Sequence, residues 1–175
     1  GPKLDHKPGR PIEFQALANS YVIIKTDVRG TGASFGYRNS PLPPEEVQDT
    51  YDILDWIIAQ PWSNGKVGAY GVSYTGMTAG MAPTVQHPAL KAIVLGWSGI
   101  YDEYKNAMQP FGFVQPGVLC QWSDLLVALW SNNAMATGQG IMPVDGDENS
   151  FLLKQAIKEH ERNETVCDLL SPVVY

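Results

Sequence analysis

The sequence predicts an α/β protein in which helices cover the faces of a parallel β-sheet. Apolar runs at residues 21–26, 66–70 and 90–96 have the length and the β-branched content of buried strands. Segments with helical character lie between these runs, and the connections are short. Strands that alternate with helices in this way are typical of βαβ units, whose strands run parallel.

The helix expected between the first two strands begins near Pro44 and ends before Pro61. Glu45 and Glu46 occupy its first turn, where the helix dipole favours acidic side chains. Its apolar face is made by residues at helical spacing, namely Val47, Tyr51, Leu54, Ile57 and Ile58. The preceding segment, 30–44, is rich in glycine and proline and is predicted to be a loop.

A Gly-x-Ser turn, from Gly71 to Ser73, joins the second strand to a small-residue helix expected at 74–86. In a nucleophile elbow a strand meets a helix at such a turn, and the serine hydroxyl stands at the carboxyl edge of the sheet. The start of the helix supplies free N–H groups that suit an oxyanion. Thr75 takes the place of the second glycine in the usual Gly-x-Ser-x-Gly pattern, and Gly76 follows one residue later. The pattern favours Ser73 as a nucleophile over a purely structural turn.

Four blocks around this serine carry a resemblance to a known family. They are residues 27–36, the pair Asp49 and Trp56, residues 60–68, and residues 71–76. In order and spacing they resemble the cocaine esterase and X-Pro dipeptidyl-peptidase group of α/β-hydrolases, which includes α-amino-acid ester hydrolases. The Gly-x-Ser-Tyr-x-Gly form of the turn is usual in that group. The resemblance covers roughly residues 20 to 100 and is weaker after about residue 105.

The resemblance implies an α/β-hydrolase fold and a serine hydrolase that cleaves acyl esters or amides. Ser73 would be the nucleophile, and the backbone N–H of Tyr74 would lie in the oxyanion hole. Small esters, β-lactam-type acyl donors and N-terminal dipeptides all remain open as substrates. The alternative is a non-catalytic α/β-hydrolase-like binding module or a degenerate hydrolase.

The character of the sequence changes after Tyr101. Loops are predicted at 109–117 and 138–146, and helices at 121–132 and 151–162. We therefore expect residues 1–101 to form part of an α/β-hydrolase core, and residues 102–175 to begin a helical cap over the carboxyl edge of the sheet. The aromatic residues that could line an acyl pocket beneath it, or simply pack in the core, are Trp97, Tyr101, Trp122 and Trp130.

The chain offers three histidines as a general base, and none fits the expected chain order of nucleophile, acid and histidine. His6 precedes the serine. His87 would lie about 20 Å from Ser73 along one helix and is expected to be a cap or surface residue. His160 is expected on the solvated face of a charged helix. The resemblance implies that the triad acid and the triad histidine come after residue 175. It also implies further strands before residue 21, together with a second oxyanion donor, which is a tyrosine in the family.

Asp27 and Arg29 follow the first predicted strand and could act in catalysis, but a structural pair that orders the glycine-rich segment is the favoured interpretation. The glycines of this segment do not predict a dinucleotide site, because the proline-rich run after them prevents a helix from starting there. No cofactor and no metal are therefore expected. Three acidic residues of the following helix are expected to be solvated or capping: Asp49, Asp52 and Asp55.

The length, composition and charge of the chain limit the number of domains and the kinds of partner that it can have. At 175 residues and 44% hydrophobic residues, the chain suits one domain, or a domain with an appendage. A net charge of −6 and a pI near 4.9 argue against a nucleic-acid partner, and no apolar run is long enough to cross a membrane. Cys120 and Cys167 are expected to be separate thiols, with the cytoplasm slightly favoured. Unpaired sheet edges would favour association of copies into a homo-oligomer.

Overall fold

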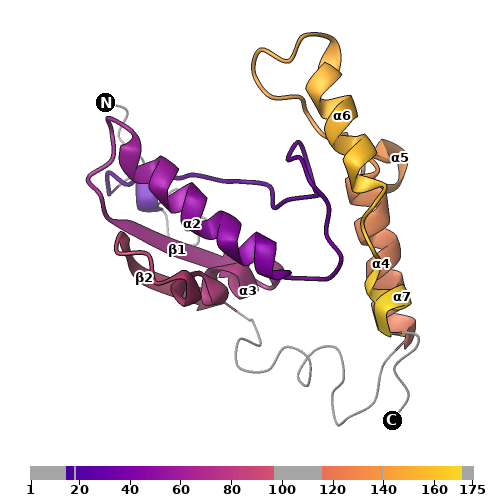
Figure 1. Ribbon diagram of the computed structural model, residues 1–175, viewed down its shortest axis with the longest axis horizontal. Helices are drawn as coiled ribbons and strands as arrows, with labels where there is room; N and C mark the ends of the chain where they lie inside the picture. Colours follow the sequence, from indigo (N-terminus) through magenta and orange to yellow (C-terminus); the bar gives the residue numbers. More distant parts are fainter. Residues whose placement is uncertain (1–14, 18, 97–115, 139, 171–175) are drawn as a thin grey trace.

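The structure is a computed structural model, and it describes residues 15–17, 19–96, 116–138 and 140–170. The first group of elements is α2 (Pro44–Ala59), β1 (Val67–Val72), α3 (Tyr74–Met81), the 3-10 helix η1 (Ala82–Val85) and β2 (Leu90–Gly96). The second group is α4 (Pro116–Trp130), α5 (Ala134–Thr137), the 3-10 helix η4 (Glu148–Ser150), α6 (Phe151–His160) and α7 (Val166–Leu170). Figure 1 shows the two groups side by side, with the loop that precedes α2 reaching from one to the other.

The two strands pair in parallel, as the βαβ pattern predicted. Their register runs from Val67 opposite Leu90 to Val72 opposite Gly96, with an irregularity after Val67. Helix α3 packs on both strands, and α2 packs against η1. The strand residues that stay exposed, because no described helix covers them, are Tyr70, Val72 and Val94. Because the strands are parallel, their carboxyl ends lie at the same end of the sheet, where α3 also begins.

The prediction of a strand at 21–26 is wrong for this structure. Residues 21–28 have no regular secondary structure, and Tyr21 and Val22 are exposed. A strand needs the hydrogen bonds of a neighbouring strand, and no described strand lies beside this segment. The helix after the serine also ends earlier than expected, at Met81, because Pro83 lacks the N–H that would continue it.

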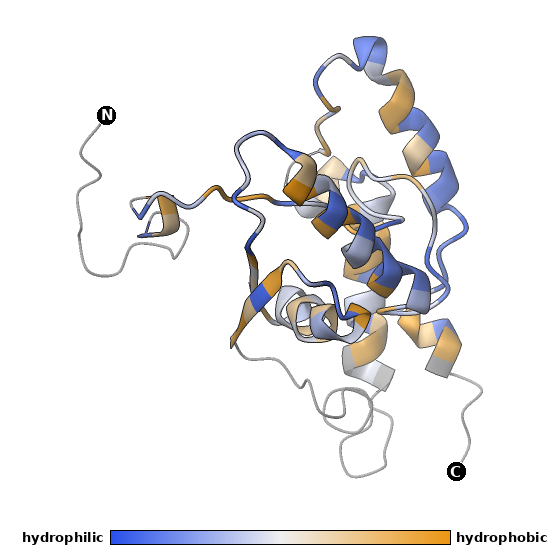
Figure 2. Ribbon diagram, turned by 60° about the vertical axis from the view of Figure 1, so that its left-hand side comes forward, coloured by the Kyte–Doolittle hydropathy of each residue, from blue (hydrophilic) through white to orange (hydrophobic). Residues whose placement is uncertain are grey.

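The second group of elements is helical, and α6 alternates hydrophobic and hydrophilic residues as an amphipathic helix does (Figure 2). The helices predicted at 121–132 and 151–162 correspond to α4 and α6 with shifted bounds. The sequence analysis did not predict α5, η4 or α7. These elements have at most five residues, too few to show a helical periodicity.

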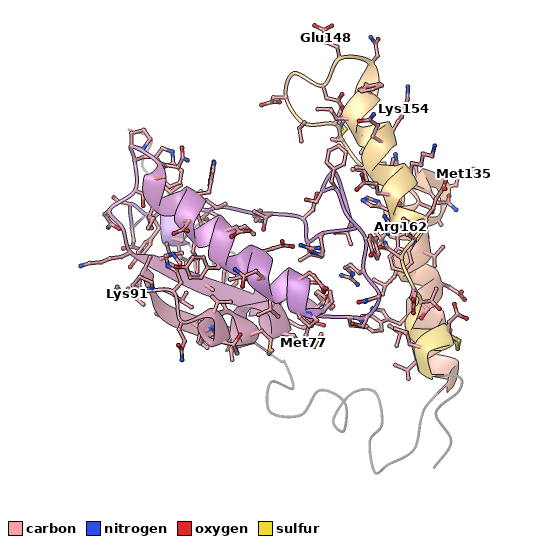
Figure 3. All side chains as sticks on the ribbon, in the orientation of Figure 1. Met77, Lys91, Met135, Glu148, Lys154 and Arg162 are labelled. Atoms are coloured by element: carbon pink, nitrogen blue, oxygen red, sulfur yellow. A yellow bond between two sulfur atoms is a disulfide. The ribbon has the colours of Figure 1, made fainter. Side chains whose placement is uncertain are left out.

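The loop at residues 30–38, here called the Gly-rich loop, is bonded to residues 159–164, here called the clamp segment. The Asn163 side chain donates to the carbonyl of Gly30 at 2.8 Å and accepts from the Arg38 N–H at 2.8 Å. Further contacts join the Gly36 N–H to Glu159 and the Glu164 N–H to the Arg38 carbonyl. The guanidinium of Arg162, which is labelled in Figure 3, lies over the Tyr37 ring. The clamp segment therefore satisfies backbone groups of a loop more than 100 residues away in the chain.

His160 lies inside this contact, so the prediction of a solvated position is wrong. Its side chain is 1% exposed. Its Nδ1 is 2.9 Å from the carbonyl oxygen of Trp130, and its Nε2 is 2.7 Å from that of Ser34. A ring N–H at either position donates to the carbonyl oxygen that it faces. The ring thereby joins α4, α6 and the Gly-rich loop.

His87 was expected to be a cap or a surface residue; it is buried, at 4% exposure, so the surface position is wrong. Its Nδ1 accepts a hydrogen bond from the Ala89 N–H at 3.0 Å, which caps the turn before β2. Its Nε2 lies 3.0 Å from Asp55, and its ring meets the edge of Tyr51 with 4.7 Å between centroids. Because Nδ1 accepts a hydrogen bond, Nε2 carries the ring proton and donates a hydrogen bond to Asp55. Asp55, although mostly exposed, is therefore engaged rather than only solvated.

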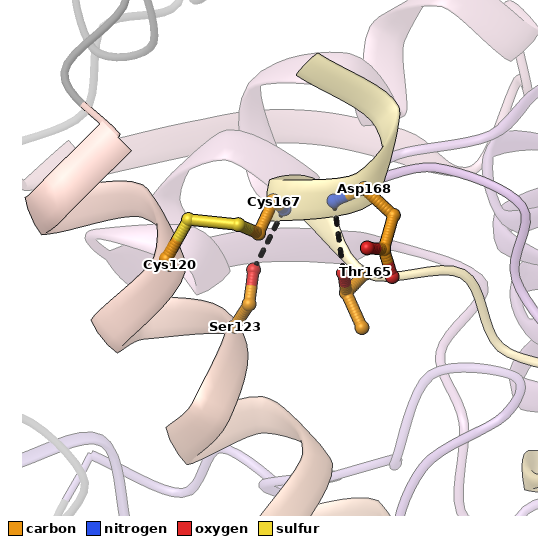
Figure 4. The surroundings of a disulfide bond; sticks show 5 residues. All are labelled: Cys120, Ser123, Thr165, Cys167 and Asp168. Carbon is orange, nitrogen blue, oxygen red and sulfur yellow. Dashed lines mark hydrogen bonds between the residues drawn. A yellow bond between two sulfur atoms is a disulfide. The ribbon is translucent and has the colours of Figure 1, made fainter. Parts of the chain in front are cut away.

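Cys120 of α4 and Cys167 of α7 form a disulfide, so the prediction of separate thiols is wrong (Figure 4). The two cysteines are 47 positions apart in the chain, but α7 folds back onto α4 and brings their Cα atoms to 4.7 Å. Ser123 supports the contact, because its hydroxyl accepts a hydrogen bond from the Cys167 N–H at 3.0 Å. Disulfides persist in oxidising compartments, and the disulfide therefore lends no support to the expectation of a cytoplasmic protein.

We predict that the double substitution Cys120→Ser/Cys167→Ser lowers the free energy of unfolding of the chain by about 2–4 kcal/mol. The disulfide removes loop-closure entropy from the unfolded state, and the closed loop spans 47 positions. Urea unfolding of both proteins, with and without a thiol reductant, measures the effect. Reductant should destabilise only the unsubstituted chain, and an equal loss in both would contradict the assignment.

Candidate active site

Ser73 lies at the turn between β1 and α3, where the sequence placed it. Its backbone has φ 58° and ψ −128°, a conformation that residues other than glycine rarely adopt. Its N–H donates to the Gly96 carbonyl at 3.0 Å, which anchors the turn to the end of β2. The side chain is exposed, and no hydrogen bond engages its hydroxyl within the part of the chain that the structure describes.

Two neighbours make this turn possible. A Cβ atom at Gly71 would collide with the backbone of Thr75, so the turn requires glycine there. The Thr75 hydroxyl accepts from the Val72 N–H at 2.9 Å and donates to the Val72 carbonyl at 2.9 Å. The threonine that replaces the second glycine of the usual pattern therefore ties the end of the strand to the start of the helix.

The start of α3 places polar backbone groups next to Ser73. The Met77 N–H donates to the Ser73 carbonyl at 3.0 Å and begins the helical hydrogen bonding. The amides of the first helical turn, beginning with that of Tyr74, have no intrahelical acceptor. They lie at the positive end of the helix dipole, so this position suits a negatively charged oxygen.

The side chain of Tyr74 points away from these amides into a polar network. Its hydroxyl donates to the Glu46 carboxylate, with both oxygens at 3.1 Å. It accepts from Nη1 of Arg38 at 3.0 Å and from the Leu42 N–H at 3.3 Å. The hydroxyl thereby uses its donor and both of its acceptor sites. The Gly-rich loop, the segment before α2, and α2 itself all meet at this one oxygen.

The network is buried, with Arg38 5% exposed and Glu46 4% exposed. Burial raises the pKa of Tyr74 to about 12, and the neighbouring Glu46 acts in the same direction against Arg38. Burial also raises the pKa of Glu46, while Arg38 and the Tyr74 hydroxyl lower it. Arg38 Nη1 lies 3.6 Å from Glu46, whereas the buried Nε of Arg38 has no partner among the described residues.

The sequence analysis missed Arg38 and Glu46 as parts of the site. Glu46 was interpreted only as an acidic residue favoured by the helix dipole. A signal was available, because Glu46 lies 8 and 11 positions before Leu54 and Ile57, on the buried face of α2. An acidic residue on an apolar face needs a partner, and this one has two.

The aromatic candidates are only partly placed. The Trp122 ring of α4 lies 6.4 Å from the Tyr74 ring between centroids, tilted by 49°. Trp97 and Tyr101 lie outside the described residues. Trp130 is buried, and its carbonyl oxygen faces His160. The structure therefore brings one predicted aromatic residue next to Tyr74.

Asp27 and Arg29 do not form the expected pair. The Arg29 guanidinium instead makes a bidentate contact with Asp49 of α2, at 2.7 and 2.6 Å. Asp49 is thus an ion-pair partner rather than a freely solvated residue. Asp27 accepts a hydrogen bond from the Ala33 N–H at 3.2 Å. Both predicted residues shape the loop, each through a different partner.

Neither described histidine reaches Ser73. His87 precedes β2, whereas Ser73 follows β1, so with parallel strands they lie at opposite edges of the sheet. His160 directs both ring nitrogens to backbone carbonyls. The third histidine, His6, lies outside the described residues. Over 15–17, 19–96, 116–138 and 140–170, no cluster of His, Cys, Asp and Glu could hold a metal ion, and no helix is long and apolar enough to span a bilayer.

Comparison with known proteins identifies the family. The family described as X-Pro dipeptidyl-peptidase (S15 family) matches residues 3–171, so the chain belongs to it. A solved structure of a CocE/NonD family hydrolase from Staphylococcus aureus superposes with a TM-score of 0.52 at 31% identity, over 61% of this chain and 19% of that chain. Together with the parallel strands and their helices, this likeness shows a fold of the α/β-hydrolase type.

Two curated relatives carry enzyme names. A Mycobacterium bovis protein named as a serine esterase is 33% identical over 95% of this chain, and the cocaine esterase of a Rhodococcus species is 35% identical over 66% of it. The chain spans 29% of the length of the first relative and 19% of the second. The family predicted from the sequence blocks is thereby confirmed.

We predict that the stability of the protein depends on pH through Glu46. Because burial raises its pKa above the ordinary 4.5, the native state holds this proton more tightly than the unfolded chain does. Its contribution to stability is complete below pH 4.5 and is lost as the pH rises through the raised pKa. Glu46→Gln cannot titrate, so the unfolding free energy of wild type minus that of the variant should fall with rising pH.

Urea unfolding at a series of pH values measures this difference, and other carboxylates cancel in the comparison. Glu45→Gln, at the exposed neighbouring position, is the matched control and should show no such fall. A difference between wild type and Glu46→Gln that is constant or grows with pH would show that burial does not dominate the pKa of Glu46.

Proposed function

We propose that this chain carries the nucleophile and one oxyanion donor of a serine hydrolase that cleaves acyl ester or amide bonds. The observation that supports this best is the geometry of Ser73. A strained, exposed serine stands between the end of a parallel strand and the start of a helix. This arrangement fits a nucleophile elbow. In the same proposal, residues 102–175 begin a cap over this edge of the sheet.

The proposed reaction begins with attack of the Ser73 Oγ on the acyl carbonyl carbon, while a general base takes the hydroxyl proton. The carbonyl oxygen becomes negatively charged and is stabilised by the Tyr74 N–H at the positive end of α3. The alcohol or amine leaves with a proton from the protonated base, and an acyl-enzyme remains on Ser73. Water then attacks the acyl carbon while the same base accepts its proton, the bond from that carbon to Ser73 Oγ breaks, and the base returns the proton to Oγ as the acid is released.

The substrate class follows from the names of the relatives. Serine esterase, cocaine esterase and X-Pro dipeptidyl-peptidase are hydrolases of esters or of peptide bonds. We propose a small ester or amide, or a short peptide, as the substrate. In the same proposal Trp122, whose ring lies 6.4 Å from that of Tyr74, contributes to binding the substrate.

The general base is proposed to come from outside this 175-residue chain. His87 is at the far edge of the sheet and His160 is engaged at both nitrogens, so neither can accept the Ser73 proton. The same observation favours a second candidate function, a non-catalytic binding module that has kept the hydrolase turn. The two functions differ in whether Ser73 reacts covalently.

We predict that a fluorophosphonate probe labels the full-length protein that contains this chain, and that Ser73→Ala abolishes the labelling. The probe forms a covalent bond with an activated serine and not with an ordinary hydroxyl. Ser131→Ala, at an exposed helix end, is the matched control and should label normally. Labelling that persists in Ser73→Ala would remove Ser73 as the nucleophile, and no labelling of wild type would favour the binding module.

The isolated 175-residue chain is predicted to be nearly inactive. Loss of a catalytic triad lowers kcat by on the order of 10⁶ in subtilisin, which leaves only the oxyanion hole and substrate binding. Hydrolysis of p-nitrophenyl acetate by this chain and by its Ser73→Ala variant tests the prediction. A Ser73-dependent rate like that of an ordinary esterase would mean that a base lies within these residues.

A further inference from the structure

We propose that Arg38 and Asn163 are positioning residues, through which the clamp segment fixes the Tyr74 side chain and with it the amide beside Ser73. The proposal rests on the proposed hydrolase function, because it assigns a purpose to the position of that amide. A chain of contacts leads from the clamp segment, residues 159–164, to the turn at Ser73.

The first link joins the clamp segment to the backbone of Arg38. Asn163 accepts from the Arg38 N–H at 2.8 Å, and the Glu164 N–H donates to the Arg38 carbonyl at 3.0 Å. The other end of the Asn163 amide donates to Gly30 at 2.8 Å, which prevents the amide from turning. Both backbone groups of Arg38 are thus held by residues that are more than 120 positions away.

The second link joins the Arg38 side chain to Tyr74. Nη1 donates to the Tyr74 hydroxyl at 3.0 Å, and the guanidinium carbon lies 5.4 Å from the centre of its ring. Glu46 accepts a hydrogen bond from the same hydroxyl and lies 3.6 Å from Nη1 of Arg38. The hydroxyl is therefore fixed between a buried cation and a buried acid. A shift of the Arg38 backbone therefore moves one of the three groups that hold the hydroxyl, the others being Glu46 and the Leu42 N–H.

The third link is the tyrosine itself. Its rigid ring connects the anchored hydroxyl to a backbone amide at the start of α3. The preceding residue, Ser73, has a strained backbone, and such a conformation persists only where the surroundings enforce it. Among the described residues, the bond from the Ser73 N–H to the Gly96 carbonyl also holds this turn, and the anchored ring acts on the residue next to it. A looser ring would let the Tyr74 N–H move relative to the oxyanion.

The test uses Asn163→Ala and Tyr74→Phe in the full-length protein. Neither change touches Ser73 or removes the Tyr74 N–H. We expect kcat to fall about 10- to 100-fold in each variant, less than the 10²–10³ for loss of a whole donor, with KM within about twofold of wild type. Because both variants break the same chain of contacts, the double variant should lose little more than the worse single one.

Amide hydrogen exchange supplies a readout that needs no activity. The Met77 N–H, bonded to the Ser73 carbonyl, reports opening of the turn. It should exchange faster in both variants, while the amides of β2 exchange as in wild type. General destabilisation would accelerate β2 as well and would overturn the proposal. Tyr74→Phe removes a single oxygen atom. If Asn163→Ala fails to fold, the hydrogen exchange of the Met77 N–H in Tyr74→Phe decides whether the positioning role holds.

Glu161→Gln is the control, since it changes an exposed side chain of the clamp segment and leaves Asn163 and the backbone bonds to Arg38 in place. It should keep wild-type kcat and exchange. Folded variants with kcat within twofold of wild type, or an equal loss in Glu161→Gln, would overturn the positioning role. If wild type shows no Ser73-dependent labelling, the proposed function fails, and the exchange of Met77 still decides whether the clamp segment holds the turn.

Discussion

The buried hydroxyl of Tyr74 is the contact on which the arrangement of this protein depends. Its donor and acceptor sites are filled by Glu46, Arg38 and Leu42, so it holds α2 and the two parts of the loop before it at a single point. Removing this hydroxyl would leave Arg38, the Leu42 N–H and Glu46 each without one hydrogen-bond partner. Ser73, the last residue of the Gly-x-Ser turn, immediately precedes Tyr74 in the chain.

The strained backbone of Ser73 is stabilised by residues directly next to it in the turn. Ser73 adopts a backbone conformation that glycine would adopt more easily, and its neighbours compensate from both sides. Thr75 ties the strand to the helix, and Gly71 leaves room for the crossing backbone. The departure from the usual second glycine thus replaces conformational freedom with two hydrogen bonds.

The helices of the second group reach the core mainly through polar contacts with the Gly-rich loop. Asn163 and His160 satisfy backbone groups of that loop, and Trp122 adds an aromatic contact with Tyr74. Within the group, the disulfide between α4 and α7 maintains the fold of the chain around the clamp segment. A loop without regular structure is thereby ordered by residues far along the chain, and it transmits that order to the site.

The sequence by itself determined the elements whose signals are local. The β1–α3–β2 unit, the helix α2 with its buried Leu54 and Ile57, and the turn at Ser73 follow from periodicity and turn chemistry within short windows. Ile58, which was expected on the same face of α2, is 38% exposed. Tertiary structure decided the features that depend on distant partners. The strand expected at 21–26 is absent because no neighbouring strand pairs with it, and Cys120 meets Cys167 because α7 folds back. His160 and Arg38 look like ordinary surface residues in the sequence, and they are buried because their hydrogen-bond partners lie in segments that only the fold brings together.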